Sequence, residues 1–184
     1  MLELRIHGRG GQGAQVGCQI LAHAFFRSGR WVQAFAAYGG ERRGAPVTAY
    51  LRVDDRPIRL RCDIERADHA LVLDASMLVE APAILGTLRD GAVVVVNGRE
   101  PPPVTLPAGA RLVTIDAAAI ARTHGLGPIV ATAVLGAFAG ATGLVALDEL
   151  VAAVEEGSPV KKRENVEACT VAYRQASRLA VVEA

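Results

Sequence analysis

Residues 2–13 read LELRIHGRGGQG, and this stretch decides the fold class. Leu2, Leu4 and Ile6 alternate with polar residues, which is the pattern of a half-buried strand. The glycines that follow predict a tight turn. Over 14–28 apolar residues recur at helical spacing, so a helix is expected directly after the turn. A strand, a glycine turn and a helix in this order are typical of α/β proteins.

Strands and helices continue to alternate along the chain. Further strands are expected at 31–36, 47–53, 58–60, 69–73, 92–96 and 112–115, with a hairpin turn at 54–57 joining the second and third of them. Further helices are expected at 77–88, 116–124, 129–142, 146–156 and 161–179. The order predicts a three-layer α/β/α fold with a mostly parallel, partly mixed sheet and C-terminal helices. We expect one domain over 1–184, helical from about residue 116.

Composition limits the classes of protein that the chain can represent. With 51% hydrophobic and 21% charged residues among 184, the chain can bury a core. A formal charge of +1 argues against binding of nucleic acid through the overall charge of the protein. With only 4% aromatic residues, a protein that binds single-stranded nucleic acid by stacking on its bases is also disfavoured. Cys18, Cys62 and Cys169 form no C-x-x-C pair. This spacing excludes a local zinc ribbon or a self-contained iron–sulfur cluster and favours a reducing compartment.

Residues 125–147 carry no charge and are numerous enough to span a bilayer. The stretch is rich in Ala, Gly and Thr, however, and Pro128 and Gly143 interrupt it. Gly136 and Gly140 form a G-x-x-x-G pair that lets two helices approach closely. We therefore expect a buried or interface helix here. The first residues show no signal peptide, so a cytoplasmic protein without a membrane partner is expected.

The glycine turn is the first candidate binding site, because a following helix N-terminus attracts anions. Its candidate residues are Gly8, Arg9, Gly10, Gly11, Gln12 and Gly13. The G-x-G-x-x-G spacing fits dinucleotide binding, but that fingerprint also expects an acid about 20 residues on. The first acid here is Glu41, beyond the strand at 31–36. A phosphate-bearing ligand, a docked partner segment and a purely structural turn remain the other interpretations.

The second candidate is the loop at 37–46, AYGGERRGAP. Arg42 and Arg43 offer guanidinium forks for carboxylate or phosphate, and the glycines around them permit unusual backbone angles. Glu41 and Gly44 complete the candidate set. Because the loop follows a strand, it lies at the sheet end that also carries the glycine turn, where ligands bind in open α/β sheets. A solvated charged face is the alternative.

Catalytic and metal-binding patterns are weak. The four histidines, His7, His23, His69 and His124, lie in separate elements without metal-ligand spacing. The chain has no G-x-S-x-G motif and no cysteine with a nucleophile signature. Cys18 and Cys169 fall on apolar helix faces and are expected in the core. We predict no catalytic residue and no metal ligand, which indicates a subunit of a larger enzyme.

Taken together, the two loops resemble a known family. Residues 6–13 (IHGRGGQG), 33–35 and 38–47 (YGGERRGAPV) are similar to the gamma subunit, elsewhere a fused domain, of the thiamine-diphosphate-dependent 2-oxoacid:acceptor oxidoreductases. The similarity continues through 59–61, 68–74 and 134–137 to Lys161, Glu164 and Asn165. Many relatives carry an asparagine at the start of the helix at 129–142, where this chain offers Thr132.

The resemblance implies a role inside a complex that oxidatively decarboxylates a 2-oxoacid to an acyl-CoA. Partner chains would hold the cofactors: thiamine-binding alpha and beta subunits with thiamine diphosphate and Mg²⁺, and a ferredoxin-like subunit with iron–sulfur clusters. Ferredoxin or another acceptor would take the electrons. This chain would bind no cofactor alone and would line the coenzyme A side, with the glycines as a backbone cradle and Arg42 and Arg43 facing an anion or a partner carboxylate. The alternative is a stand-alone NAD(P)-type module.

Overall fold

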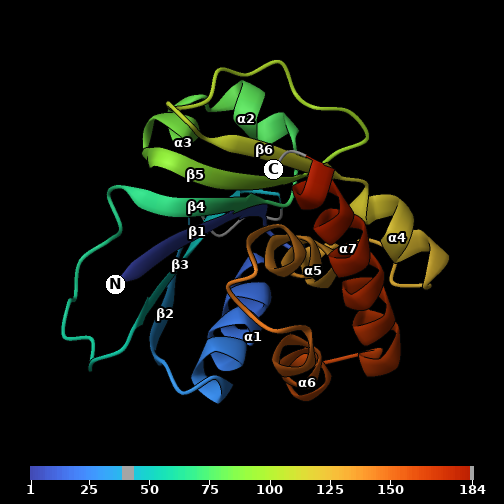
Figure 1. Cartoon of the computed structure of the whole chain (residues 1–184). Coiled ribbons are helices and arrows are strands. Elements are labelled where there is room, and N and C mark those ends of the chain that lie inside the picture. The colour runs from blue at the N-terminus through green and yellow to red at the C-terminus, as the bar shows by residue number, and fades with distance from the viewer. Residues whose placement is uncertain (39–43, 183–184) are drawn as a thin grey trace.

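The computed structural model describes residues 1–38 and 44–182, and its centre is a six-stranded mixed sheet (Figure 1). The strands are β1 (Leu2–Arg9), β2 (Trp31–Tyr38), β3 (Pro46–Asp54), β4 (Ala67–Val72), β5 (Leu88–Asn97) and β6 (Arg111–Ile115), in the order β2-β3-β1-β4-β5-β6. The neighbouring pairs β1–β4, β4–β5 and β5–β6 are parallel, whereas β3 is antiparallel to both β1 and β2. The predicted fold class, with its mostly parallel, partly mixed sheet, is confirmed.

Helices cover both faces of the sheet, unequally (Figure 1). The helices are α1 (Ala14–Arg27), α2 (Ser76–Glu80), α3 (Ala83–Gly86), α4 (Ala117–Thr123), α5 (Ala131–Thr142), α6 (Leu147–Gly157) and α7 (Lys162–Val182). One core packs α1 and α4 to α7 against the sheet, and a smaller core lies under α2 and α3. In β5, Val93 and Val95 enter the larger core while Val94 and Val96 enter the smaller one, as strand alternation requires.

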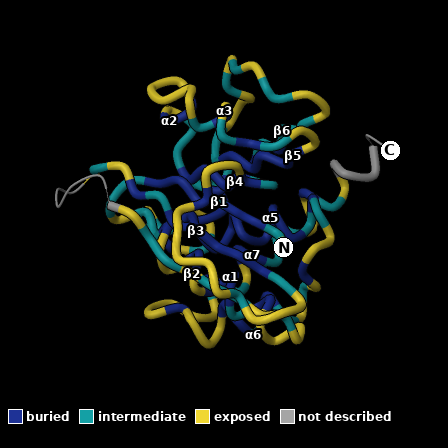
Figure 2. Tube along the Cα trace, turned by 90° about the vertical axis from the view of Figure 1, so that its left-hand side faces the viewer, coloured by how far each residue is buried: buried dark blue, intermediate teal, exposed yellow. Residues whose placement is uncertain are grey.

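The uncharged stretch at 125–147 contains a buried helix, α5, as expected. Ten of the twelve residues of α5 are buried, and α5 packs against α7 within the larger core (Figure 2). Helix–helix contact therefore accounts for its apolar composition. Within the described part of the chain, no helix combines the length and apolarity that crossing a bilayer requires.

The predicted hairpin between 47–53 and 58–60 is wrong. Residues 58–60 form no strand, and β3 instead pairs with β2 on one edge and β1 on the other. Because both edges of β3 are already hydrogen-bonded, no edge is left for residues 58–60. The coil is held from the side, where Gln33 Nε2 donates to Leu60 O at 2.6 Å and Arg52 Nη1 donates to Cys62 O at 2.8 Å.

The predicted helix at 77–88 is also wrong. The segment forms two short helices, α2 and α3, and Leu88 already belongs to β5. Pro82 separates the two helices because proline lacks an N–H, and it disfavours helical angles in the preceding residue. Ala81 accordingly leaves the helical region, with φ −133° and ψ 69°. The layer over the smaller core is therefore thin.

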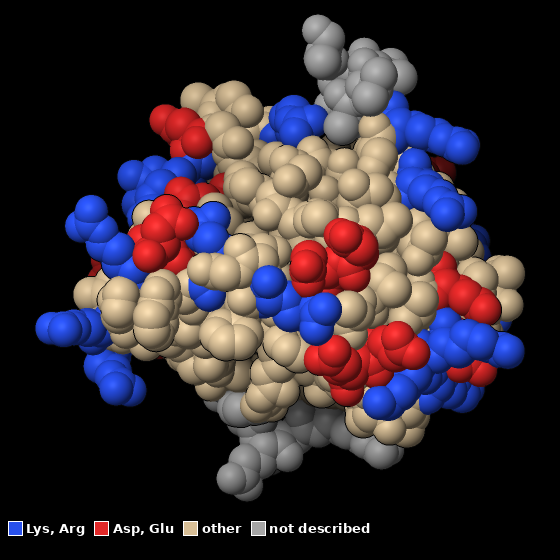
Figure 3. Space-filling view, turned by 60° about the horizontal axis from the view of Figure 1, so that its bottom comes forward, with Lys and Arg blue, Asp and Glu red and all other residues tan. Residues whose placement is uncertain are grey.

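Charged side chains of both signs are interspersed on the face shown in Figure 3, around a broad uncharged area. Across α1 and α6, Arg27 pairs with Glu149 at 2.8 Å and with Glu156 at 3.1 Å. Such local pairing agrees with the formal charge of +1.

Candidate functional site

The glycine turn leads from the carboxyl end of β1 into α1. Gly11 and Gly13 have φ values of 96° and 87°, a left-handed region in which a side chain is strained. Gly13 caps α1 without a side-chain hydrogen bond, and the amides of Ala14 and Val16 precede the first intrahelical bond, from Gly17 N to Gly13 O. Among the described residues no side chain caps this helix N-terminus, which suits an anion or a carbonyl oxygen.

The structure joins the two candidate loops at residues that it describes. Gly10 N donates to Ala45 O at 2.9 Å, and Gly44 beside it has a φ of 82°. Gly8 packs so closely that a Cβ there would lie 3.1 Å from a Leu73 methyl carbon. The expectation that the second loop lies at the same sheet end is met for its last residues. Glu41, Arg42 and Arg43 lie outside the described residues.

Arg9 and Gln12 use their side chains within the molecule. Arg9 pairs with Asp74 at 3.1 Å and with Glu80 at 2.7 Å. Gln12 Oε1 accepts from Arg9 N at 2.8 Å, which closes the turn. Burial alone would raise the pKa of Asp74, but hydrogen bonds from Ser76 and Arg9 hold that pKa below its usual value. The charge of Arg9 is thus largely neutralised by carboxylates of the same chain.

Two hollows open on the turn. The first, which we call the turn hollow, has a volume of about 310 Å³ and is lined by Arg9, Gly10, Gly11, Gly13, Ala14, Gln15, Val16 and Val47. The second, which we call the apolar cleft, has a volume of about 110 Å³ and is lined by Gly11, Gln12, Gly13, Val16, Gly17, Ile20, Ile129, Ala131, Thr132, Ser158, Pro159, Val160 and Asn165. The second half of the glycine turn separates them.

The wall of the apolar cleft comes from three remote segments. Thr132 Oγ1, in the first turn of α5, donates to Asn165 Oδ1 at 2.8 Å. The Asn165 amide in turn donates to Val160 O at 3.0 Å and to Lys161 O at 2.9 Å. Thr132 therefore ties α5 to the start of α7. Sequence reasoning singled out Thr132 and Asn165 separately, by resemblance, but missed Ser158, which carries no motif.

His7 lies at the end of β1, just before the turn, and is buried. Its Nδ1 lies 3.3 Å from Thr48 Oγ1, and its Nε2 has no hydrogen-bond partner within 1–38 and 44–182. Burial, and then the nearby Arg5 charge, lowers the pKa of His7 to about 4. His7 is therefore neutral at pH 7 and supplies no charge to the turn.

Because of His7, the free energy of unfolding of the chain should decrease as the pH is lowered. Between pH 6.5 and pH 4 the unfolded state binds a proton at His7 that the folded state does not. The contribution of His7 to stability is therefore complete above pH 6.5 and is lost towards pH 4. The pKa difference corresponds to about 3 kcal/mol. Urea unfolding of the full chain at several pH values, beside the His7→Gln variant, measures this. A variant with an equally steep pH dependence would contradict it.

Other side chains with possible chemistry lie elsewhere. Cys18 and Cys169 are in the core, as predicted, and burial raises the pKa of each thiol to about 12. Cys62 is exposed. Among the described residues, no three histidine, cysteine or acidic side chains gather as a metal site would require.

Comparison with known proteins identifies the family. The model of the family described as pyruvate ferredoxin/flavodoxin oxidoreductase matches residues 3–177. The chain belongs to this family. The chain is 44% identical to the pyruvate synthase subunit PorC of Methanocaldococcus jannaschii over 95% of its length and 97% of the relative's. It is 47% identical to the pyruvate/ketoisovalerate oxidoreductases common subunit gamma of Thermococcus kodakarensis, covering 85% of this chain and 86% of that one.

A solved structure agrees with this membership of the pyruvate ferredoxin/flavodoxin oxidoreductase family. The crystal structure of the pyruvate oxidoreductase subunit PORC of Thermotoga maritima superposes with a TM-score of 0.80 at 31% identity, over 94% of this chain and 95% of that chain. The resemblance drawn from the two loops is confirmed. The chain is a gamma-type subunit of an oxidoreductase complex of this family.

Proposed function

We propose that this gamma subunit forms the coenzyme A side of the active site in a 2-oxoacid:ferredoxin oxidoreductase that converts a 2-oxoacid and coenzyme A into an acyl-CoA with oxidative decarboxylation. The observation that carries the proposal is the hydrogen bond from Gly10 N to Ala45 O. It holds Ala45 against the glycine turn, and Arg43 and Arg42 precede Ala45 by two and three residues in the sequence. An anionic ligand suits both a helix N-terminus and arginine side chains.

The position of Arg9 supports this assignment. Its guanidinium is already paired with Asp74 and Glu80, so it has little charge left for a ligand. Arg42 and Arg43 are the basic residues nearest to Gly44 in sequence. They would therefore supply the cationic contacts to phosphate groups that reach the turn hollow.

A stand-alone NAD(P)-type module is less well supported. In dinucleotide-binding folds the second parallel strand lies beside the first, and its terminal acid reaches the ribose. Here antiparallel β3 separates β2 from β1. The end of β2 is thus displaced by one strand from the glycine turn, and β2 contains no acidic residue.

Partner chains complete the enzyme in this proposal. Thiamine-binding alpha and beta subunits hold thiamine diphosphate and Mg²⁺, and a ferredoxin-like subunit holds the iron–sulfur clusters that pass electrons to ferredoxin. When bound there, these groups cleave the 2-oxoacid and remove its electrons. The present chain positions the coenzyme that accepts the acyl group and binds none of these cofactors alone.

Replacing Arg42 and Arg43 by alanine should lower coenzyme A-dependent turnover of the assembled complex at least about tenfold, because a charge-assisted hydrogen bond is worth about 1.5–3 kcal/mol. Acceptor reduction at varied coenzyme A concentration measures the effect. Size-exclusion chromatography checks assembly, since a contact to a partner carboxylate would also be lost.

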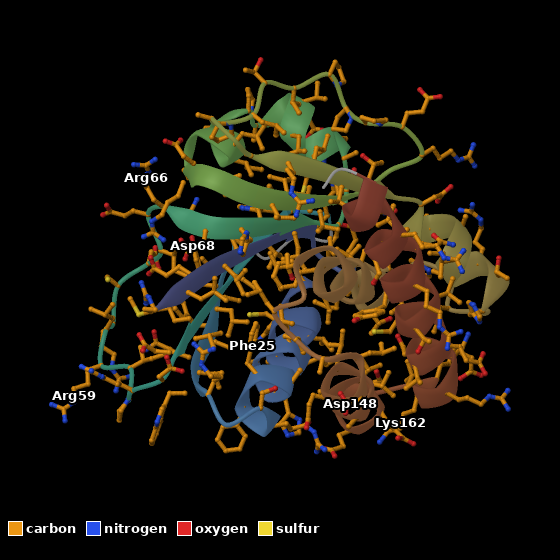
Figure 4. All side chains as sticks on the ribbon, viewed as in Figure 1. Phe25, Arg59, Arg66, Asp68, Asp148 and Lys162 are labelled. Atoms are coloured by element: carbon orange, nitrogen blue, oxygen red, sulfur yellow. The ribbon has the colours of Figure 1, made fainter. Side chains whose placement is uncertain are left out.

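Arg56 and Arg59 offer a matched control of equal charge change. Both are exposed and lie in the coil after β3. Because β3 is antiparallel to β1, this coil lies at the amino end of β1, away from the glycine turn, and Arg59 points outward there (Figure 4). The Arg56→Ala, Arg59→Ala variant should keep wild-type turnover. Equal kinetics and assembly for both double variants would refute the proposed role.

A further inference from the structure

We infer that the apolar cleft holds the neutral pantetheine arm of coenzyme A while the turn hollow receives the phosphate-bearing half. This inference rests on the proposed function and assigns the two halves of the ligand to two neighbouring hollows. The two hollows share the second half of the glycine turn as their common wall. A single extended ligand can therefore occupy both.

The electrostatics of the apolar cleft favour an uncharged occupant. No Asp, Glu, Lys or Arg is among the described residues that line it. The N-termini of α1, α5 and α7 border it, but so does the C-terminus of α6, which Ser158 caps. A helix N-terminus favours a negative charge and a helix C-terminus favours a positive one, so their effects on a charged group partly cancel. A neutral chain of amide and alkyl groups fits such a wall better than a phosphate does.

The size of the apolar cleft and the exposed residues at its rim indicate that it binds one part of a larger ligand. About 110 Å³ is ample for more than one water but smaller than the roughly 300–1,000 Å³ of pockets that enclose whole ligands. Val16 and Val160 lie at the rim, and 52% of Val160 is exposed to solvent. Exposed valines beside an apolar cleft extend its apolar surface for an occupant that enters from solvent.

One polar atom in the apolar cleft lacks a hydrogen-bond partner among the residues that the structure describes. It is the Oγ of Ser158, a residue that is 3% exposed. An unpaired buried hydroxyl costs free energy unless a ligand or water satisfies it. Thr132 Oγ1 already donates to Asn165, so it retains acceptor capacity only. A donor at Ser158 and an acceptor at Thr132 match the carbonyl and N–H groups of pantetheine amides, and its geminal methyl groups match the apolar wall.

The test uses the complex assembled with its partner subunits. Val160→Trp, at an exposed position, should cover the mouth of the apolar cleft without disturbing the core. We expect the KM for coenzyme A to rise at least tenfold and the use of free pantetheine as acyl acceptor to fall equally. Inhibition by adenosine 3′,5′-bisphosphate, the nucleotide half without the arm, should change less than twofold. Ser158→Ala should raise the KM for coenzyme A about fivefold.

Leu144→Trp is the matched control, because Leu144 is an exposed apolar residue beyond the other end of α5. It should leave both KM and inhibition at wild-type values. An unchanged KM for coenzyme A in Val160→Trp would overturn the inference. So would a KM that rises together with the inhibition constant of the nucleotide half, because both halves would then share one hollow.

The result also separates this inference from the proposed function. If the Arg42→Ala, Arg43→Ala variant weakens coenzyme A use while Val160→Trp does not, the proposed function stands and the assignment of the apolar cleft fails. If neither variant affects coenzyme A use, the proposed function itself fails.

Discussion

Gly136→Ala should destabilise the full chain by about 3 kcal/mol, because α5 and α7 pack too closely to admit a methyl group. A Cβ on Gly136 would lie 2.1 Å from Cys169 O, and one on Gly140 would lie 2.3 Å from Tyr173 O. Both obstacles are backbone atoms, so the helices themselves must separate. The gain in helix propensity from Gly to Ala, about 1 kcal/mol, offsets only part of this cost. The midpoint of urea unfolding measures the loss.

Gly86→Ala is the control for this substitution. Gly86 lies in α3, has no positive φ, and a Cβ there would meet no atom within 4 Å. Its variant should remain within about 0.5 kcal/mol of wild type. If the Gly136 and Gly86 variants unfolded at the same urea concentration, the close approach of α5 and α7 would not be a stabilising constraint.

The sequence correctly predicted the elements that a local pattern of residues determines. The alternation at Leu2–Ile6 and the helical spacing after Gly13 define the β1-turn-α1 unit. The G-x-x-x-G pair at Gly136 and Gly140 correctly indicated helix contact. The error at residues 58–60 has a different origin. Alternation of apolar and polar residues can predict a strand, but it does not predict which neighbouring strand will hydrogen-bond to each of its edges. Both edges of β3 were filled by β1 and β2.

The candidate site was predictable to a similar degree. A run of glycines between a strand and a helix indicates a candidate binding turn, because the first amides of a helix lack intrahelical partners and the glycines let a ligand approach them. The apolar cleft could not be predicted, since Thr132, Ser158 and Asn165 come from segments that meet only through tertiary packing. The role of Arg9 was hidden for the same reason: its partners Asp74 and Glu80 are more than 60 residues away.

Removing Glu3 should destabilise the chain by about 3–5 kcal/mol, because it strips buried Arg52 of its carboxylate partner. Arg52 is 1% exposed and donates from Nε to Glu3 Oε1 at 2.9 Å. Its other nitrogens donate to Gln33 Oε1 and to the main-chain oxygens of Cys62 and Asp63. These neutral acceptors cannot compensate the charge of a guanidinium held away from water. Thermal and urea unfolding of Glu3→Leu in the full chain measure the loss.

A double-mutant cycle tests whether the buried charge causes this loss. Glu3→Leu combined with Arg52→Met removes both charges and should cost about 2 kcal/mol less than the sum of the single variants. Arg89 provides the comparison, because it pairs with the same carboxylate at 2.8 Å while its side chain is 42% exposed. Arg89→Met should cost at most about 1 kcal/mol, since water solvates and screens that pair. Equal losses for Arg52→Met and Arg89→Met, with additive effects in the cycle, would show that burial does not set the strength of this pair.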